Sequence, residues 1–192
     1  KIAEPPNKAM ARGAEIHSIA ENYVKGKIAR LPAELKLFKD EFTRLRKLYK
    51  KDPDKIVVED TWAFTDDWIE TAWNNWTGCW VRIKLDLAHQ QNDPNVLYVR
   101  DWKTGKFDPA NQEDYLEQLE LYALGAFLMY DNIQEVRPSL GYLDHGNTHP
   151  LPDSPIIFKR SDLEKLKKIW NKRVKAMMND VIFAPRPNDK CK

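Results

Sequence analysis

The chain has 192 residues, of which 42% are hydrophobic and 31% charged, and this composition is ordinary for a globular protein with one substantial core. Its two cysteines, Cys79 and Cys191, are too few for a disulfide framework or a four-thiolate metal site, which favours a reducing compartment such as the cytoplasm. The longest apolar run, Leu121–Tyr130, is far shorter than the roughly 20 residues of a membrane span, and no charged-then-apolar leader opens the sequence, so we expect neither membrane insertion nor secretion.

The net charge of +2 is unevenly distributed along the chain. Residues 159–175 carry eight Lys or Arg against two acids, and residues 36–55 carry eight against four. Residues 59–70 and 108–120 each carry five acids and no base. This polarity is compatible with a polyanionic partner held by basic flanks around an acidic, metal-binding centre. Solvated lysines on long helices would give the same pattern, so charge alone leaves both interpretations open.

Two amphipathic helices open the predicted fold. Residues 11–26 and 32–52 each place apolar side chains at helical spacing, and Gly26 is a suitable stop for the first helix. The apolar positions are Ile16, Ile19, Ala20, Tyr23 and Val24 in the first segment and Leu35, Phe38, Phe42, Leu45 and Leu48 in the second.

The hydrophobic period then changes to two residues, which is typical of strands. Residues 55–65 are β-branched and aromatic, and residues 78–88 alternate strictly. The alternation places Val81, Ile83, Leu85 and Leu87 on one face and Arg82, Lys84 and Asp86 on the other. Residues 89–95 have turn chemistry and residues 96–103 read as the next strand, so we expect an antiparallel hairpin over 80–103.

A helix, a strand and a closing helix are predicted over residues 110–130, 135–146 and 161–179. The complete order is therefore helices, a cluster of strands, and then helix, strand and helix. This order indicates an α/β sandwich with a mixed central sheet flanked by helices.

The stretch RDWKTGK, residues 100–106, ends a strand with an acid and a lysine two positions apart. Side chains two apart share a face of a strand, so Asp101 and Lys103 point the same way. Asp86 lies on the neighbouring predicted strand, and two such carboxylates repel each other unless a divalent cation lies between them. Aspartate oxygens suit Mg²⁺ and Mn²⁺. A carboxylate–metal site with a lysine in reach is suited to the hydrolysis of a phosphodiester.

Other polar residues accompany this pair in a fixed order. His17 lies on the first helix, and Gln118 and Tyr122 lie four apart on one face of a later helix. From Arg12 to about Tyr130, the motifs RGAEIH, IKLDLA, RDWKTGK and QLELY together resemble the RecB-like branch of the PD-(D/E)xK nuclease superfamily. This branch includes the RecB and AddAB nuclease domains, CRISPR-associated RecB-like exonucleases and many phage exonucleases. No single motif is specific, whereas all four in order are.

The resemblance implies a restriction-endonuclease-like core in a single nuclease domain over residues 1–192, and metal-dependent hydrolysis of DNA, most often from an end. It implies that His17, Asp86, Asp101 and the backbone carbonyl of Trp102 hold Mg²⁺ or Mn²⁺. Lys103 would be the catalytic lysine. Gln118 and Tyr122 would shape the site or contact DNA.

The same resemblance implies single-stranded or duplex DNA ends as the binding partner, in recombination, repair or phage DNA processing. Some members of the branch form homo-oligomers, and others work inside helicase complexes. We expect a cytoplasmic protein, in the host cytoplasm if a phage encodes it.

Two features depart from the family pattern. Members often have glycine at the start of the strand that carries the first aspartate, whereas Arg82 and Lys84 stand nearby here. Iron–sulfur members carry one cysteine before the histidine helix and three near the C-terminus, whereas no cysteine precedes His17 here and Cys191 stands alone. An iron–sulfur cluster is therefore not supported.

Several further residues have two interpretations. Glu59 could be an additional acidic ligand, but the sequence favours an edge residue of its strand. We expect His89, His145 and His149 to lie on the surface, because their contexts resemble turns.

Five tryptophans fall between Trp62 and Trp80, where they could stack single-stranded bases or pack against the domain. We favour packing for most of them, with exposure confined to Trp68, Trp73 or Trp76. On the last helix, basic side chains could follow a phosphate backbone or form a solvated face. They are Lys165, Lys168, Lys172 and Arg173.

Two rival functions remain beside the nuclease. A non-catalytic nucleic-acid-binding protein on the same fold would lack the ligands or the lysine, and all of them are present here. A metalloenzyme unrelated to DNA, with Zn²⁺ on His17 and the acids, is disfavoured by the oxygen-dominated ligands.

Overall fold

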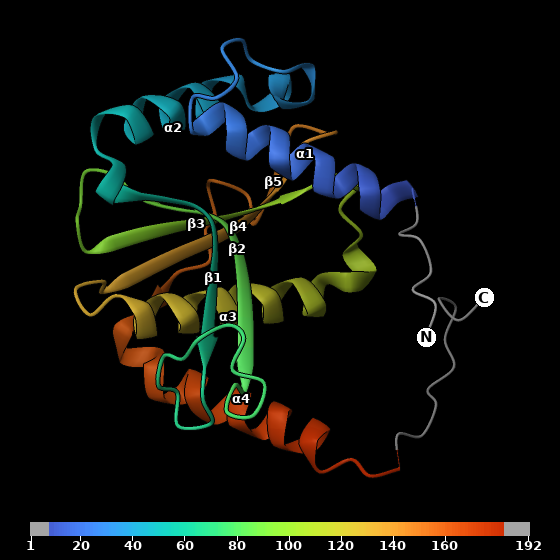
Figure 1. Cartoon of the computed structure of the whole chain (residues 1–192), viewed down its shortest axis with the longest axis vertical. Coiled ribbons are helices and arrows are strands. Elements are labelled where there is room, and N and C mark those ends of the chain that lie inside the picture. Colours follow the sequence, from blue (N-terminus) through green and yellow to red (C-terminus); the bar gives the residue numbers. More distant parts are fainter. Residues whose placement is uncertain (1–7, 183–192) are drawn as a thin grey trace.

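A computed structural model describes residues 8–182, except for the side chains of residues 176–178. The described residues form four α-helices and a six-stranded sheet, with short 3₁₀ turns between them (Figure 1). The helices are α1 (Lys8–Val24), α2 (Lys39–Lys51), α3 (Gln112–Met129) and α4 (Leu163–Met178). The strands are β1 (Ile56–Phe64), β2 (Val81–Gln90), β3 (Val96–Lys103), β4 (Glu135–Tyr142), β5 (Asn147–His149) and β6 (Phe158–Lys159).

The sheet is mixed, as the sequence predicted. Its strand order is β1-β2-β3-β4-β5, with β6 also paired to β4. Among the described strands only β3 and β4 are parallel, and α3 forms the crossover that a parallel connection requires. The expected antiparallel hairpin over residues 80–103 is confirmed as β2 and β3. No helix in residues 8–182 is long and apolar enough to cross a membrane.

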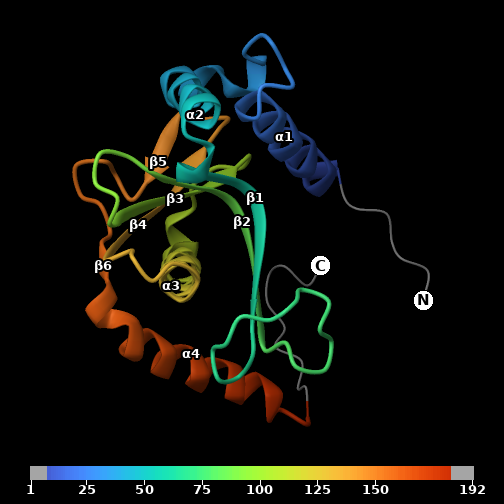
Figure 2. The ribbon, with the colours of Figure 1, turned by 60° about the vertical axis from the view of Figure 1, so that its left-hand side comes forward.

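The helices cover both faces of the sheet. Figures 1 and 2 show α1 and α2 together on one face, α3 against the other, and α4 beyond α3. The apolar stripe predicted for α1 is buried, and it packs with α2 against the sheet as one core cluster. A larger cluster lies between the sheet, α3 and α4, which explains why the second half of α3 is buried nearly all round. The predicted second helix is shorter than expected, because residues 33–38 form a 3₁₀ turn before α2 begins.

The β1–β2 ribbon changes face in its middle. Glu59 has a φ of 53°, in the left-handed region that side chains other than glycine rarely adopt. Beyond this point the ribbon leaves β3, because the β2–β3 pairing ends at Leu87 and Arg100. The remainder runs down beside α3 (Figure 2), where Gly125 allows close approach: a Cβ there would lie 2.6 Å from Ile83 Cδ1.

This bend corrects one prediction about β2. Val81, Ile83 and Leu85 do share a face and pack in the α3 cluster. Leu87 instead packs in the α1–α2 cluster, while its neighbour Ala88 takes the α3 side. The strict alternation therefore shifts by one position across Asp86.

The prediction that His89 lies on the surface is wrong. His89 is 3% exposed on β2 and stacks on Tyr98 with ring centroids 5.3 Å apart. Burial, followed by the positive charge of Arg44, lowers the pKa of His89 to about 3. His145 is exposed as expected, and His149 is half-buried against Phe107.

The buried imidazole makes stability depend on pH in a defined window. Because the folded pKa lies below the unfolded value of about 6.5, the unfolded state binds the proton more tightly, so stability falls as pH drops from about 6.5 towards 3. We expect wild type to lose about 2 kcal/mol more than His89→Phe between pH 7 and pH 5. Phenylalanine keeps the stacking on Tyr98. Urea unfolding at both pH values measures the difference, and equal losses in the two proteins would contradict it. His145→Phe is the exposed control.

Candidate metal centre and adjoining lysine site

The candidate site begins where the β2–β3 ladder stops. Because the residues of β2 that precede Leu87 lie away from β3, the backbone N–H of Trp102 on β3 has no partner on β2. The carboxylate of Asp86 accepts that N–H instead, with Oδ2 at 2.7 Å. A buried backbone donor must be paired, so this bond fixes the Asp86 side chain against β3. The Asp86 side chain is buried, whereas Lys84, two positions earlier on β2, is exposed.

His17 of α1 covers the same point from above. Its Nε2 lies 2.8 Å from the backbone oxygen of Trp102, and its Nδ1 lies 3.1 Å from Asp86 Oδ1. Both neighbours are acceptors, so the doubly protonated ring satisfies both contacts. The hydrogen bond to Asp86 raises the pKa of His17, and burial opposes this only in part. A cation that binds at this position would displace a proton from the ring.

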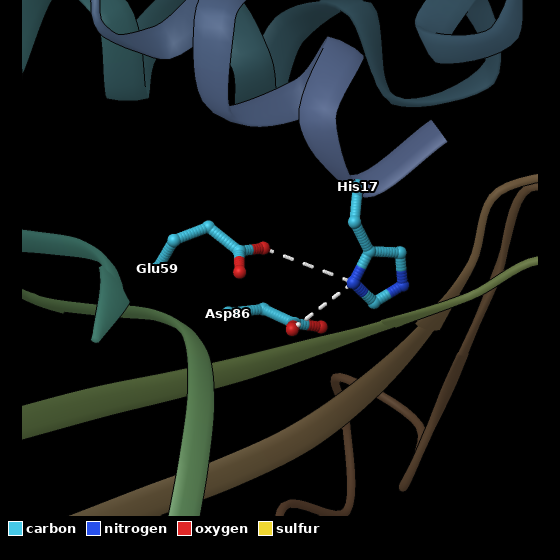
Figure 3. Close-up of side chains that lie close together, drawn as sticks. All are labelled: His17, Glu59 and Asp86. Atoms are coloured by element: carbon cyan, nitrogen blue, oxygen red, sulfur yellow. Dashed lines mark hydrogen bonds and ion pairs between the residues drawn. The ribbon is translucent and has the colours of Figure 1, made fainter. Parts of the chain in front are cut away.

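Glu59 of β1 is the third member of the group. Its Oε1 lies 3.8 Å from His17 Nδ1, and its Oε2 lies 3.3 Å from Lys84 Nζ. Figure 3 shows the three side chains converging from α1, β1 and β2. The sequence favoured Glu59 as an edge residue. Its left-handed backbone breaks the alternation of β1, so that Glu59 and the preceding Val58 both lie on the α1–α2 side, and nothing in the sequence signals this.

These three residues fit a divalent cation. One ligand atom from each of His17, Glu59 and Asp86 lies within 4.8 Å of the other two. Burial, followed by the charge of Asp86, raises the pKa of Glu59. Two carboxylates that disfavour each other's ionisation are the arrangement that a cation stabilises. An imidazole with two carboxylates suits Mn²⁺ or Mg²⁺.

Asp101 lies below this group in a separate hydrogen-bonded network. Its Oδ1 accepts from Tyr122 Oη at 2.5 Å and from Gln118 Nε2 at 3.1 Å. Its Oδ2 lies 2.8 Å from Lys103 Nζ as an ion pair but accepts no well-aligned hydrogen bond. Lys103 also donates to Gln118 Oε1 at 3.1 Å. Burial, followed by the charge of Asp86, raises the pKa of Asp101, so an additional positive charge here would be stabilising.

Most of the residues predicted for the site therefore come together around one backbone segment. His17, Asp86 and the Trp102 carbonyl meet above β3, and Asp101, Lys103, Gln118 and Tyr122 meet below it. Asp101 is not one of the three residues whose ligand atoms already converge. Three residues lie elsewhere, because they are on the exposed side of α4, beyond α3 from the site (Figure 1). They are Lys165, Lys168 and Lys172.

Two open clefts flank His17. One, of about 260 Å³, is lined by Glu59, Lys84 and side chains between residues 13 and 21 of α1. The other, of about 560 Å³, is lined by Lys103, Lys106 and aromatic side chains that include Tyr115. Gly13 and His17 border both clefts. The candidate metal centre is thus reached from two sides beneath α1.

Comparison with known families agrees with this geometry. A family model described as the PD-(D/E)XK nuclease superfamily matches residues 1–192, and the chain belongs to that superfamily. The mixed sheet flanked by four helices is consistent with the restriction-endonuclease-like core of the superfamily. No curated protein sequence matches the chain significantly.

A cation at this centre should reverse the effect of neutralising Glu59. Without metal, Glu59→Gln should raise the free energy of unfolding by about 1 kcal/mol at pH 7.5, because it removes a carboxylate whose ionisation burial and Asp86 disfavour. With Mn²⁺ at about 100 times its Kd, wild type should gain about 2.7 kcal/mol and the variant much less.

Urea unfolding with EDTA, Mg²⁺, Mn²⁺ and Zn²⁺ measures both effects. Glu70→Gln, at an exposed acid of the β1–β2 loop, is the matched control. Equal gains in wild type and Glu59→Gln with Mn²⁺ would contradict a cation centre that includes Glu59.

The Tyr122 hydroxyl should stabilise the fold through Asp101. Tyr122→Phe removes a 2.5 Å hydrogen bond to a buried carboxylate and should cost about 1.5–3 kcal/mol. Tyr49→Phe, at a half-buried tyrosine of α2, should cost much less. Thermal and urea unfolding of both variants test this, and equal losses would mean that the Asp101 bond contributes nothing specific.

Proposed function

Because the chain belongs to the PD-(D/E)XK nuclease superfamily, we propose that it is a divalent-metal-dependent deoxyribonuclease that hydrolyses phosphodiester bonds, more readily from a DNA end than internally. The observation that carries this proposal is the placement of Asp86 and Asp101 on either side of the Trp102 backbone. One carboxylate belongs to a group of candidate cation ligands, and the other lies beside a lysine.

In the proposed site, His17, Glu59 and Asp86 hold Mg²⁺ or Mn²⁺, with Asp101 and the Trp102 carbonyl as further ligands. The ion, when bound, supplies positive charge to a phosphate oxygen and acidifies water. The chain positions these ligands without mobile loops, since each comes from a helix or a paired strand. Such preorganisation avoids reorganisation during the reaction.

Lys103 has the position of the catalytic lysine. Its ammonium group is held between Asp101 Oδ2 and Gln118 Oε1, and its side chain is 31% exposed, toward the larger cleft. There it can orient an attacking water or balance charge on the phosphate. Gln118 positions the lysine and Asp101 together, because it donates to one and accepts from the other. Tyr122 donates to Asp101 Oδ1, the same oxygen that accepts from Gln118, while Lys103 lies beside Oδ2.

The finer parts of the proposal rest on different supports. Assignment to the RecB-like branch, with its preference for free ends and its setting in recombination, repair or phage DNA processing, rests on the order of the four sequence motifs. The candidate centre supports the chemistry, and it is equally compatible with internal cleavage.

A nuclease assay on linear and covalently closed circular DNA tests the proposal. With Mn²⁺ or Mg²⁺ we expect linear DNA to be degraded, circles to be spared, and EDTA to stop the reaction. Lys103→Ala should lower the rate by about 10²–10⁴-fold, because it removes the proton-transfer or charge-balancing group. Lys50→Ala, at an exposed lysine of α2, should leave the rate unchanged.

The other outcomes are equally informative. Cleavage of circles would keep the chemistry and make the protein an endonuclease. Absence of cleavage by folded wild type, or cleavage indifferent to Lys103, would contradict the enzyme and favour a non-catalytic nucleic-acid-binding protein. A thermal melt of Lys103→Ala separates loss of activity from loss of fold.

A further inference from the structure

The outer face of β2 connects the candidate centre to the tip of the β1–β2 ribbon. Arg82, Lys84 and Asp86 occupy alternate positions of the strand. The positions before each of them, Val81, Ile83 and Leu85, are buried against α3. At about 3.3 Å per residue, Arg82 lies about 13 Å from Asp86 along the strand. Two positive side chains therefore lie in line with the candidate ligand.

Lys84 also belongs to the smaller cleft beside His17. Its side chain is 65% exposed, and its Nζ lies 3.3 Å from Glu59 Oε2. Because Lys84, Glu59 and His17 line one cleft, a chain lying on Lys84 reaches the candidate centre without crossing an apolar barrier. Lys84 gives this approach a positive charge.

Two exposed indoles stand at the far end of this face, in the loop of residues 65–80. Trp73 is 40% exposed and Trp76 is 79% exposed, as expected from the sequence. Trp68 differs from that expectation, because it is buried and its Nε1 donates to Asn171 of α4. The loop is thus anchored to α4 at Trp68 and leaves the other two rings to solvent.

Arg82 holds these rings in place. Its guanidinium carbon lies 4.6 Å from the Trp76 ring centroid and 5.9 Å from that of Trp73. Its Nε donates to the backbone oxygen of Trp73 at 2.8 Å, while its Nη2 is buried without a hydrogen-bond partner. An indole so exposed contributes little to the core, and a cation with an unsatisfied donor lies directly behind it.

We propose that a single-stranded segment of nucleic acid lies along this face, with a phosphate on Lys84 and a base stacked on Trp76. The inference rests on the proposed nuclease function and adds its substrate class: a strand that is unpaired for a few nucleotides to one side of the cut. Inside a duplex, neighbouring pairs cover both faces of each base, whereas an unpaired strand can offer its bases to the Trp73–Trp76 pair. Aromatic rings accept every base, which suits an enzyme that does not read sequence.

Binding measured in EDTA, where cleavage cannot occur, tests the segment separately from catalysis. The probes are a fluorescently labelled single-stranded oligonucleotide and the blunt duplex of the same sequence. Trp76→Ala should weaken single-strand binding by about 5- to 150-fold, the range for one stacked base. Trp76→Phe should restore most of the affinity, and duplex binding should change little. Ile69→Ala, at a 64% exposed position of the same loop, is the control.

A second variant tests the path rather than the stacking. Lys84→Met keeps the aliphatic length and should lower the salt dependence of single-strand binding by about one released counterion. Loss from Trp76→Ala no greater than from Ile69→Ala, or equal loss for strand and duplex, would overturn the proposal.

The two proposals fail separately. Normal single-strand binding by a protein that cleaves nothing would contradict the nuclease and leave the binding face intact. Metal-dependent cleavage with binding indifferent to Trp76 and Lys84 would do the reverse.

Discussion

The hydrogen bond between the Trp102 backbone and the Asp86 carboxylate is the constraint on which the site depends. It replaces the next backbone pair of the β2–β3 ladder at the point where the ladder stops. A side chain that takes over a backbone partner is held as rigidly as the sheet itself. His17 contacts both residues that form this bond, through the Trp102 carbonyl and the Asp86 carboxylate. Position, orientation and charge of the centre all follow from one interruption of the sheet.

The interruption has a cause in the neighbouring strand. Glu59 adopts a left-handed conformation, which costs on the order of 1–3 kcal/mol for a residue with a side chain. The β1–β2 ribbon turns away from β3 at this position and packs on α3 near Gly125, which offsets the local cost by burying Trp62 and Ile83. The same turn brings the Glu59 carboxylate to His17. Strain, the end of the ladder and the third candidate ligand therefore have one origin.

Charge in the site is arranged so that each buried acid has an opposite partner. His17 lies beside Asp86, Lys84 beside Glu59, and Lys103 beside Asp101. Even so, burial and mutual repulsion raise the pKa of both Glu59 and Asp101. Because the ionisation of these two carboxyl groups is still disfavoured, a further positive charge beside them would be stabilising. This property distinguishes a candidate cation site from a set of structural ion pairs.

Periodicity was enough to predict the mixed α/β architecture and the hairpin of β2 and β3. Spacing was enough to place Asp101 with Lys103, and Gln118 with Tyr122, on shared faces. These features depend on neighbours along one strand or one helix, where spacing alone decides which side chains share a face. Asp86 was suggested by its place on the neighbouring strand, whereas the resemblance suggested that His17, Gln118 and Tyr122 belong to the same site.

Three outcomes were decided only by tertiary packing. Glu59 joins the centre because of its left-handed backbone conformation, which the residue type does not predict. His89 is buried although it borders a turn, because α2 covers that end of the sheet and its Arg44 lies close enough to affect the imidazole. The α4 lysines are placed away from the site because α3 lies between. Spacing along the chain determines which side chains share a face of a helix or strand. What that face packs against depends on contacts between elements far apart in sequence.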